Sequence, residues 1–155
     1  EIHTANRPIH TLSVDKIKKF VRPFFKTFLK LLLIRNFYVA IVSFSKHVDL
    51  IRDIIHDMLA PELSKSVIIK GSDSIVYDGD GCKLGKQIHM TTAVMNIIRR
   101  EKFCGNDISI TRASSLLIDD DVKNIATALR EGVRAVHFNP QNLHHFIEDM
   151  TSLFP

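Results

Sequence analysis

Apolar residues along the chain follow two patterns that alternate from end to end. Short, nearly continuous apolar runs are separated by longer segments in which apolar residues recur every three or four positions. The first pattern is typical of strands covered on both faces, and the second of helices with one apolar face. Strands are predicted at 37–44, 66–70, 115–118 and 134–138. Strands that alternate with helices predict an α/β fold, with a Rossmann-like parallel sheet and helices on both faces.

The helical segments have recognisable ends. After an aperiodic stretch, 1–12, Ser13 is a candidate N-cap for a pattern that runs to Leu32, and Pro23 should kink this element or divide it in two. Its aromatic positions could line a groove, but at this spacing they more often form core. Those positions are Phe20, Phe24, Phe25 and Phe28. Further helices are predicted at 48–58, from Lys86 onward, around 125–129 and at 143–150. Ala60-Pro61 should stop the first of these, and Gly132 is a candidate C-cap for the third.

Length and composition indicate an ordinary soluble domain. The 155 residues predict a single domain, 1–155, with 45% hydrophobic and 25% charged residues and no internal repeat. The formal charge of +4 suits an anionic substrate such as a phosphate ester. It is too small to indicate nucleic-acid binding, for which no motif is present.

Cysteine usage and targeting signals suggest the cytoplasm. Two cysteines, Cys82 and Cys104, do not make a disulfide framework, and no signal peptide is evident. The most apolar stretch, 29–45, is interrupted by charged and polar residues, so no membrane span is predicted. The stretch 71–85 is expected to be a loop; its Asp-Gly-Asp-Gly at 78–81 resembles the start of a calcium loop but lacks the rest of that motif, which favours a turn.

The strongest chemical signal is the run Leu116-Leu117-Ile118-Asp119-Asp120-Asp121, an apolar strand that ends in three acids. Ligands of open α/β sheets bind at the carboxyl ends of strands, and crowded carboxylates favour a cation. Asp119 and Asp120 are therefore candidate Mg²⁺ ligands. Acids before a helix also cap its N-terminus, and this structural role suits Asp121 best.

Two further polar residues stand at positions that suit phosphate chemistry. Ser43 follows the strand that includes Val39-Ala40-Ile41-Val42, and Lys86 begins a helix. A hydroxyl, an ammonium and a metal-binding acid pair are what phosphoryl transfer needs. Each also has a simpler role: Ser43 could satisfy backbone groups at a strand end, and Lys86 could be a solvated lysine.

The order of these residues resembles the haloacid dehalogenase superfamily of Rossmann-like phosphohydrolases. Val-Ser-Phe-Ser at 42–45 is similar to its second motif, Lys86 to the basic residue of the third, and 116–125 with Asn124 to the fourth. The resemblance implies an Mg²⁺-dependent phosphatase that works through an aspartyl-phosphate. In it Ser43 and Lys86 bind the phosphoryl group, Asp119 and Asp120 bind Mg²⁺, and Asn124 supports the acidic loop, although it could orient that loop without touching a ligand.

The first motif of that superfamily, an Asp-x-Asp whose leading Asp is the nucleophile, is not found before Ser43, where the only aspartate is Asp15. In the superfamily this motif ends a central strand, between the strands that carry the second and fourth motifs. We therefore expect the nucleophile strand to lie before residue 1. The segment before Ser43 and the 71–85 loop are too short for a large cap, which resembles small-cap or capless members that act on phosphoproteins or exposed phosphate esters.

Two other functions are compatible with parts of this pattern. A catalytically inactive binding or interaction domain would keep the acidic pocket without the nucleophile. A receiver-like signalling domain is disfavoured, because the strand ends at Ser43 and Lys70 carry no Asp. The identity of the substrate and the oligomeric state have no signature in the sequence.

Overall fold

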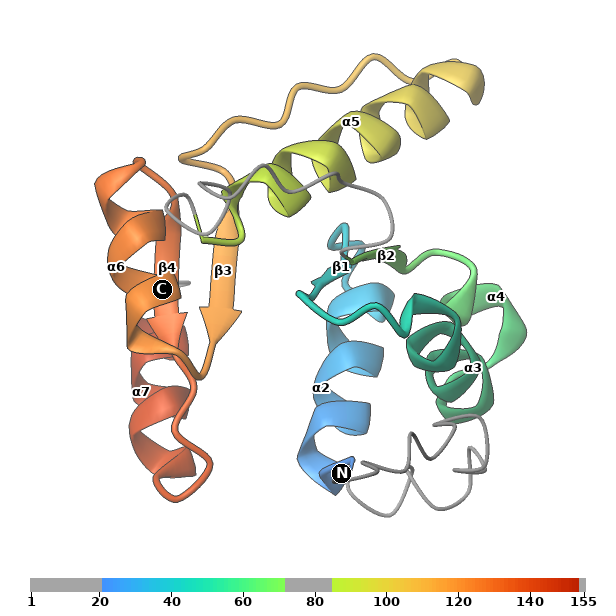
Figure 1. The fold of residues 1–155 in the computed structure, drawn as a ribbon. Helices are drawn as coiled ribbons and strands as arrows, with labels where there is room; N and C mark the ends of the chain where they lie inside the picture. Colours follow the sequence, from blue (N-terminus) through green and yellow to red (C-terminus); the bar gives the residue numbers. More distant parts are fainter. Residues whose placement is uncertain (1–20, 72–84, 154–155) are drawn as a thin grey trace, which may run out of the picture. The chain divides into compact units, whose positions relative to one another are not determined.

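The computed structural model describes residues 21–71 and 85–153, which form a mixed α/β structure (Figure 1). Its elements, in chain order, are α2 (Pro23–Ile34), β1 (Ala40–Val42), α3 (Val48–Met58), α4 (Pro61–Ser64), β2 (Ile68–Lys70), α5 (Gln87–Phe103), β3 (Leu116–Asp119), α6 (Val122–Arg130), β4 (Arg134–His137) and α7 (Leu143–Leu153). The alternation of helices and strands predicted from the hydrophobic pattern is confirmed.

The strands form two small parallel sheets. β1 pairs with β2, and β3 pairs with β4, with Leu116 opposite Arg134 and Asp119 opposite His137. Parallel pairing brings the carboxyl ends of β3 and β4 to the same edge. Each sheet has two strands in the described part of the chain.

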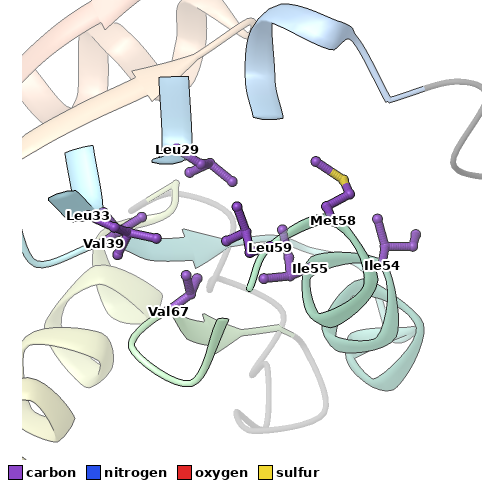
Figure 2. Packing of buried hydrophobic residues seen from close by; sticks show 8 residues of the cluster. All are labelled: Leu29, Leu33, Val39, Ile54, Ile55, Met58, Leu59 and Val67. Atoms are coloured by element: carbon purple, nitrogen blue, oxygen red, sulfur yellow. The ribbon is translucent and has the colours of Figure 1, made fainter. Parts of the chain in front are cut away.

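The described residues fall into two compact units, each with a buried apolar cluster. The first unit comprises 21–41 and 47–69, and the second comprises 42–46, 70–71 and 85–153. In the first, the helices α2 and α3 bury aliphatic side chains together with residues that flank the strands (Figure 2). These residues are Leu29, Leu33, Val39, Ile54, Ile55, Met58, Leu59 and Val67. The prediction of a single domain stays a prediction.

α2 begins at Pro23, which occupies the first turn of the helix. The part of the predicted pattern before residue 21 lies outside the described residues, so whether Pro23 kinks or divides one longer element stays a prediction. The buried face of α2 is formed by Leu29 and Leu33. Phe24 and Phe28 stack on each other with ring centroids 5.5 Å apart, and Phe25 is 36% exposed. The prediction that the aromatic stripe forms core is therefore wrong for Phe25, because the leucines occupy the inner face of the helix.

The strand predicted at 37–44 is shorter in the structure, where β1 covers only Ala40–Val42. The cause is the end of α2. Asn36 adopts a left-handed conformation with φ of 60°, and the Phe37 N–H donates to the Leu32 carbonyl at 3.0 Å. This is a Schellman-type helix end. Because the Phe37 N–H is bonded to the helix, the strand begins only after this residue.

The second unit is built around the β3–α6–β4 segment. α6 packs on both strands and α7 packs on β4 (Figure 1). Leu117, Ala128 and Val133 form its buried cluster, with Val42 packed against them. Gly132, at a φ of 78°, ends α6 in a Schellman motif in which the Val133 N–H donates to the Ala128 carbonyl at 2.9 Å. The predicted role of Gly132 in ending this helix is confirmed.

Three sequence predictions lie outside the described residues. They are the N-cap at Ser13, the helical segment up to Phe20, and all of the 71–85 loop except Gly71 and Gly85, including the turn at 78–81. Among the helices that the structure describes, none has the length and apolar character needed to span a membrane.

Candidate functional site

Asp119, the last residue of β3, is the centre of a polar cluster in the second unit. Its side chain is only 1% exposed, and Lys86 Nζ lies 2.7 Å from its Oδ2 atom. This is a short contact between an ammonium and a carboxylate oxygen, and in the described residues Lys86 is the cation paired with Asp119. The other oxygen, Oδ1, accepts the Asp121 N–H at 2.9 Å and the Asn124 side-chain amide at 3.2 Å.

This environment sets the charge of Asp119. Burial, the largest single effect, would raise the pKa of its carboxyl group. The Lys86 ammonium, the Asp121 N–H and the Asn124 amide together outweigh burial and hold the pKa below its ordinary value. Asp119 is therefore ionised at neutral pH, and its negative charge is balanced locally by Lys86, which is 18% exposed.

Asn124 links the acidic loop to the start of α5. It is buried on α6, and its amide group donates to Asp119. A Cβ atom added at Gly85 would lie 3.0 Å from the Asn124 Oδ1 atom, so the absence of a side chain at Gly85 makes room for Asn124. Gly85 also has a φ of 51°, which favours glycine. Gly85, directly before Lys86, thus allows the start of α5 to lie close to Asn124 of α6.

The other two acids of the run have different environments. Asp121 is the N-cap of α6 and accepts the Lys123 N–H at 2.8 Å, which confirms its predicted capping role. Asp120 is exposed, and its carboxylate has no hydrogen-bond or ion-pair partner within 21–71 and 85–153. Asp120 is therefore the carboxylate of this run that is free to take up a ligand.

The end of β4 holds the backbone of the acidic loop. The Phe138 N–H donates to the Asp119 carbonyl at 2.8 Å, and His137 Nε2 lies 3.1 Å from the Asp120 carbonyl. Because a carbonyl only accepts, Nε2 must carry the hydrogen in this contact. The loop is thus bound through its backbone by His137 and Phe138, and through the Asp119 side chain by Lys86, the N-cap of α5, and Asn124 of α6.

Ser43 lies in the same unit, directly after β1. Its N–H donates to the Lys70 carbonyl at 2.9 Å, and its hydroxyl oxygen accepts the Ser45 N–H at 3.0 Å. The neighbouring Phe44 ring meets His89 of α5 edge-on, with centroids 5.5 Å apart. In the described residues, no hydrogen bond or ion pair joins Ser43 to Lys86 or Asp119. The hydroxyl satisfies the backbone, as its simpler role predicts, and keeps its hydrogen for another acceptor.

The structure brings together Lys86, Asp119 and Asn124 of the predicted site residues, with Asp120 next to them on the chain. Sequence reasoning missed Gly85 and His137. The available signals were a glycine directly before the candidate lysine, and a polar residue at the end of the strand that follows the acidic one.

The described residues fit part of a magnesium site. Within 21–71 and 85–153 the Asp120 carboxylate has no hydrogen-bond or ion-pair partner, and Oδ2 of Asp119 is paired with Lys86. Within the part of the chain that the structure describes, no group of three or more His, Cys, Asp or Glu side chains could enclose a metal ion. Mg²⁺ at this position would thus need further oxygen ligands, from water, substrate or another segment, as is common for this ion.

Comparisons with protein families, with curated proteins and with solved structures found no match to this chain.

Proposed function

We propose that this protein is a Mg²⁺-dependent phosphohydrolase with a Rossmann-like fold of the haloacid dehalogenase type. The observation that carries the proposal is the Lys86–Asp119 ion pair, at 2.7 Å, where β3 ends. Asp120, the next residue, has a carboxylate without a hydrogen-bond or ion-pair partner among the described residues. A basic residue at a helix start, paired with an acid after a buried strand, is the combination that the resemblance implies.

In this proposal Ser43 and Lys86 bind oxygens of the phosphoryl group. The Lys86 ammonium would contact both the Asp119 carboxylate and an oxygen of the phosphoryl group. The Ser43 hydroxyl would donate its hydrogen to another oxygen of that group. Asp120 binds Mg²⁺ directly, and Asp119 binds it directly or through water, while Asn124 keeps Asp119 in place. When bound, Mg²⁺ would offset the negative charge that develops on the transferred phosphoryl group.

The nucleophile would be an aspartate of an Asp-x-Asp segment outside these 155 residues. Its carboxylate would attack phosphorus, the bond to the leaving alcohol would break, and water would then hydrolyse the aspartyl-phosphate. The resemblance places this segment on a strand next to the one that carries Asp119. β3 has β4 as its hydrogen-bonded neighbour on one edge, and its other edge has no strand partner among the described residues, which supports this placement.

The test is hydrolysis of p-nitrophenyl phosphate by the full-length natural protein, with Mg²⁺ and with excess chelator. Intact mass and N-terminal sequencing of that protein would establish whether an Asp-x-Asp precedes Glu1. We expect Mg²⁺-dependent release of phosphate, abolished by Asp119→Asn combined with Asp120→Asn. Asp107→Asn, which neutralises an exposed acid of the loop after α5, is the matched control and should keep full activity.

Two outcomes would contradict the proposal. Activity that survives the double substitution at Asp119 and Asp120 would exclude this mechanism. Activity that is equal with and without Mg²⁺ would exclude the metal-dependent class.

The alternative is a catalytically inactive binding or interaction domain. The specific observation in its favour is that Lys86 and Asp119 already neutralise each other, so the pair is stable as a structural element. A natural protein without Asp-x-Asp that still binds phosphate esters, without hydrolysing them, would favour this alternative.

The partner in either case is a phosphorylated small molecule or a phosphoprotein, and neither nucleic acid nor a membrane is part of the proposal. A reducing compartment such as the cytoplasm agrees with Cys104, which is a free and exposed thiol; Cys82 lies outside the described residues.

A further inference from the structure

We propose that His137 is a positioning residue for Mg²⁺ binding, which acts by fixing the peptide group between Asp120 and Asp121. This inference rests on the proposed function, because it concerns the same acidic loop. Neither the sequence patterns nor the resemblance assigns a role to His137.

Both polar atoms of that peptide group are bound. Its carbonyl oxygen, from Asp120, lies 3.1 Å from His137 Nε2. Its N–H, from Asp121, donates to Asp119 Oδ1 at 2.9 Å. Hydrogen bonds at the two ends of one peptide group polarise each other, so donation by His137 strengthens the bond from the Asp121 N–H to the Asp119 carboxylate.

The position of His137 follows from the strand register. It lies opposite Asp119 in the β3–β4 pair, and the next residue, Phe138, donates its N–H to the Asp119 carbonyl. Two successive carbonyls of the acidic loop, those of Asp119 and Asp120, are thus bound by two successive residues: Phe138, which directly follows β4, and His137, the last residue of β4. The contact from the His137 side chain to the Asp120 carbonyl thus adds a hydrogen bond one residue beyond Asp119, where the β3–β4 backbone pairing ends.

The geometric consequence falls on Asp120. Its carboxylate has no partner among the described residues, so its direction depends on its backbone. A fixed Asp120–Asp121 peptide group limits the backbone rotation of Asp120 and sets the relation of its carboxylate to that of Asp119. Groups that orient metal ligands in this way typically change metal affinity by about 10- to 100-fold when they are replaced.

The experiment compares His137→Gln with His137→Asn in the full-length protein. The Gln side chain can place an amide N–H near the position of His Nε2, whereas Asn is one methylene shorter and does not reach the carbonyl. Mg²⁺ affinity is measured by titration calorimetry. We expect His137→Gln to keep most of the affinity and His137→Asn to weaken it by about 10-fold. His144→Asn, at a histidine with an 84% exposed side chain on α7, is the control and should match the wild type.

A second readout needs no metal. Hydrogen exchange of the Asp121 amide should be faster in His137→Asn than in His137→Gln, because the polarising contact is lost. Nitrogen NMR of the imidazole should show the Nε2–H tautomer in the wild type. A ring protonated only at Nδ1 would overturn the proposal whatever the metal affinity.

The outcomes separate this inference from the proposed function. If the wild type binds Mg²⁺ and both variants bind it equally well, His137 has no positioning role, while the proposed function stands. If the wild type binds no Mg²⁺, the proposed function fails and the role of His137 toward the metal fails with it. Weaker binding in both variants would mean that a donor alone does not replace the imidazole, and this would also overturn the proposal.

Discussion

At the scale of single residues, Asp119 is ionised in surroundings where burial alone would favour the neutral acid. Three donors offset the cost of burial: the Lys86 ammonium, the Asp121 N–H and the Asn124 amide. Each donor comes from a different place, namely the start of α5, the acidic loop and α6. The charge of Asp119 therefore depends on how these segments pack together.

Asp119→Asn tests this arrangement through the dependence of stability on pH. The folded pKa of Asp119 lies below its ordinary value of 3.8. Its contribution to the free energy of unfolding is then fully present above the unfolded pKa and is lost as pH falls through the folded pKa. We expect the variant to be less stable than the wild type by about 2 kcal/mol at pH 7, below the range for fully buried pairs because Lys86 is partly exposed.

Urea unfolding from pH 7 downward measures this effect. The gap between wild type and Asp119→Asn should begin to narrow near the unfolded pKa of about 4 and should close as pH falls through the lower folded pKa, where the wild-type carboxyl group takes up its proton. Asp120→Asn, at an exposed acid without a partner in the described residues, should show no such gap. A gap for Asp119→Asn that stayed constant with pH would contradict the ionised state proposed here.

Gly85→Ala tests the close approach between the start of α5 and Asn124. The new Cβ atom would lie 3.0 Å from Asn124 Oδ1, in addition to the cost of a φ of 51°. Gly105→Ala is the matched control, since Gly105 has a φ of 84° and nothing within 4 Å of the added atom. The backbone cost alone is about 1 kcal/mol. Thermal unfolding should show a larger loss for Gly85→Ala, and equal losses would mean that Asn124 moves away freely.

The sequence could nominate the acids, Lys86 and Asn124 as candidates, because chain order and residue type are enough for the resemblance, and the structure shows that Lys86 and Asn124 both contact Asp119. It could not identify Gly85 and His137 as part of the site. Gly85 matters because it faces a side chain of α6, and His137 because the strand register places it opposite Asp119. Both roles depend on contacts between segments that are distant along the chain.

At the scale of elements, the packing of α6 on β3 sets the distance between Asn124 and Asp119. Ala128, one turn after Asn124, is fully buried in the cluster with Leu117 and Val133. A small residue at this point lets the helix approach the strand closely. We therefore expect a longer side chain at position 128 to disturb the Asn124–Asp119 contact.

Ala128→Leu should push α6 away from β3. We expect a loss of about 1–3 kcal/mol from overpacking, together with weaker Mg²⁺ binding, because Asn124 would move relative to Asp119. Ala126→Leu is the control, because Ala126 is exposed on the same helix and should change stability little. Chemical denaturation and calorimetric titration with Mg²⁺ measure both effects. If Ala128→Leu lost stability but kept its Mg²⁺ affinity, the link from α6 packing to the site would be wrong.

For the elements that it predicted, the hydrophobic pattern gave the type better than the length, and it did not predict the short helix α4 (Pro61–Ser64). The run 37–44 looks like one long strand, but Phe37 and Tyr38 are each 45% exposed and the strand begins only at Ala40. Asn36, in a left-handed conformation, ends α2, and the Phe37 N–H is hydrogen-bonded to the last turn of that helix. Periodicity does not contain this information, although an Asn after a helical pattern is a known C-terminal signal.

At the scale of the whole molecule, each unit has its own buried cluster, and the two clusters are unequal. Counting described residues alone, the first cluster has eight buried residues and the second has three, although the candidate site belongs to the second unit. Parallel pairing of strands was predictable from the alternating pattern, whereas the division into two units was not. That division depends on the contacts between segments that are distant along the chain. A local hydrophobic pattern does not predict such contacts.

Leu29→Ala and Leu117→Ala compare the two units with the same change of side chain. Leu29 is 3% exposed in the first unit and Leu117 is 4% exposed in the second. Each substitution removes the same buried atoms, so each should destabilise the protein by about 2–5 kcal/mol. Only Leu117 lies on β3, two residues before Asp119, so only Leu117→Ala should also weaken Mg²⁺ binding at a temperature where both variants remain folded. Equal loss of Mg²⁺ affinity in the two variants would mean that the first unit contributes to the site, and the acidic cluster could then not be treated as a property of the second unit alone.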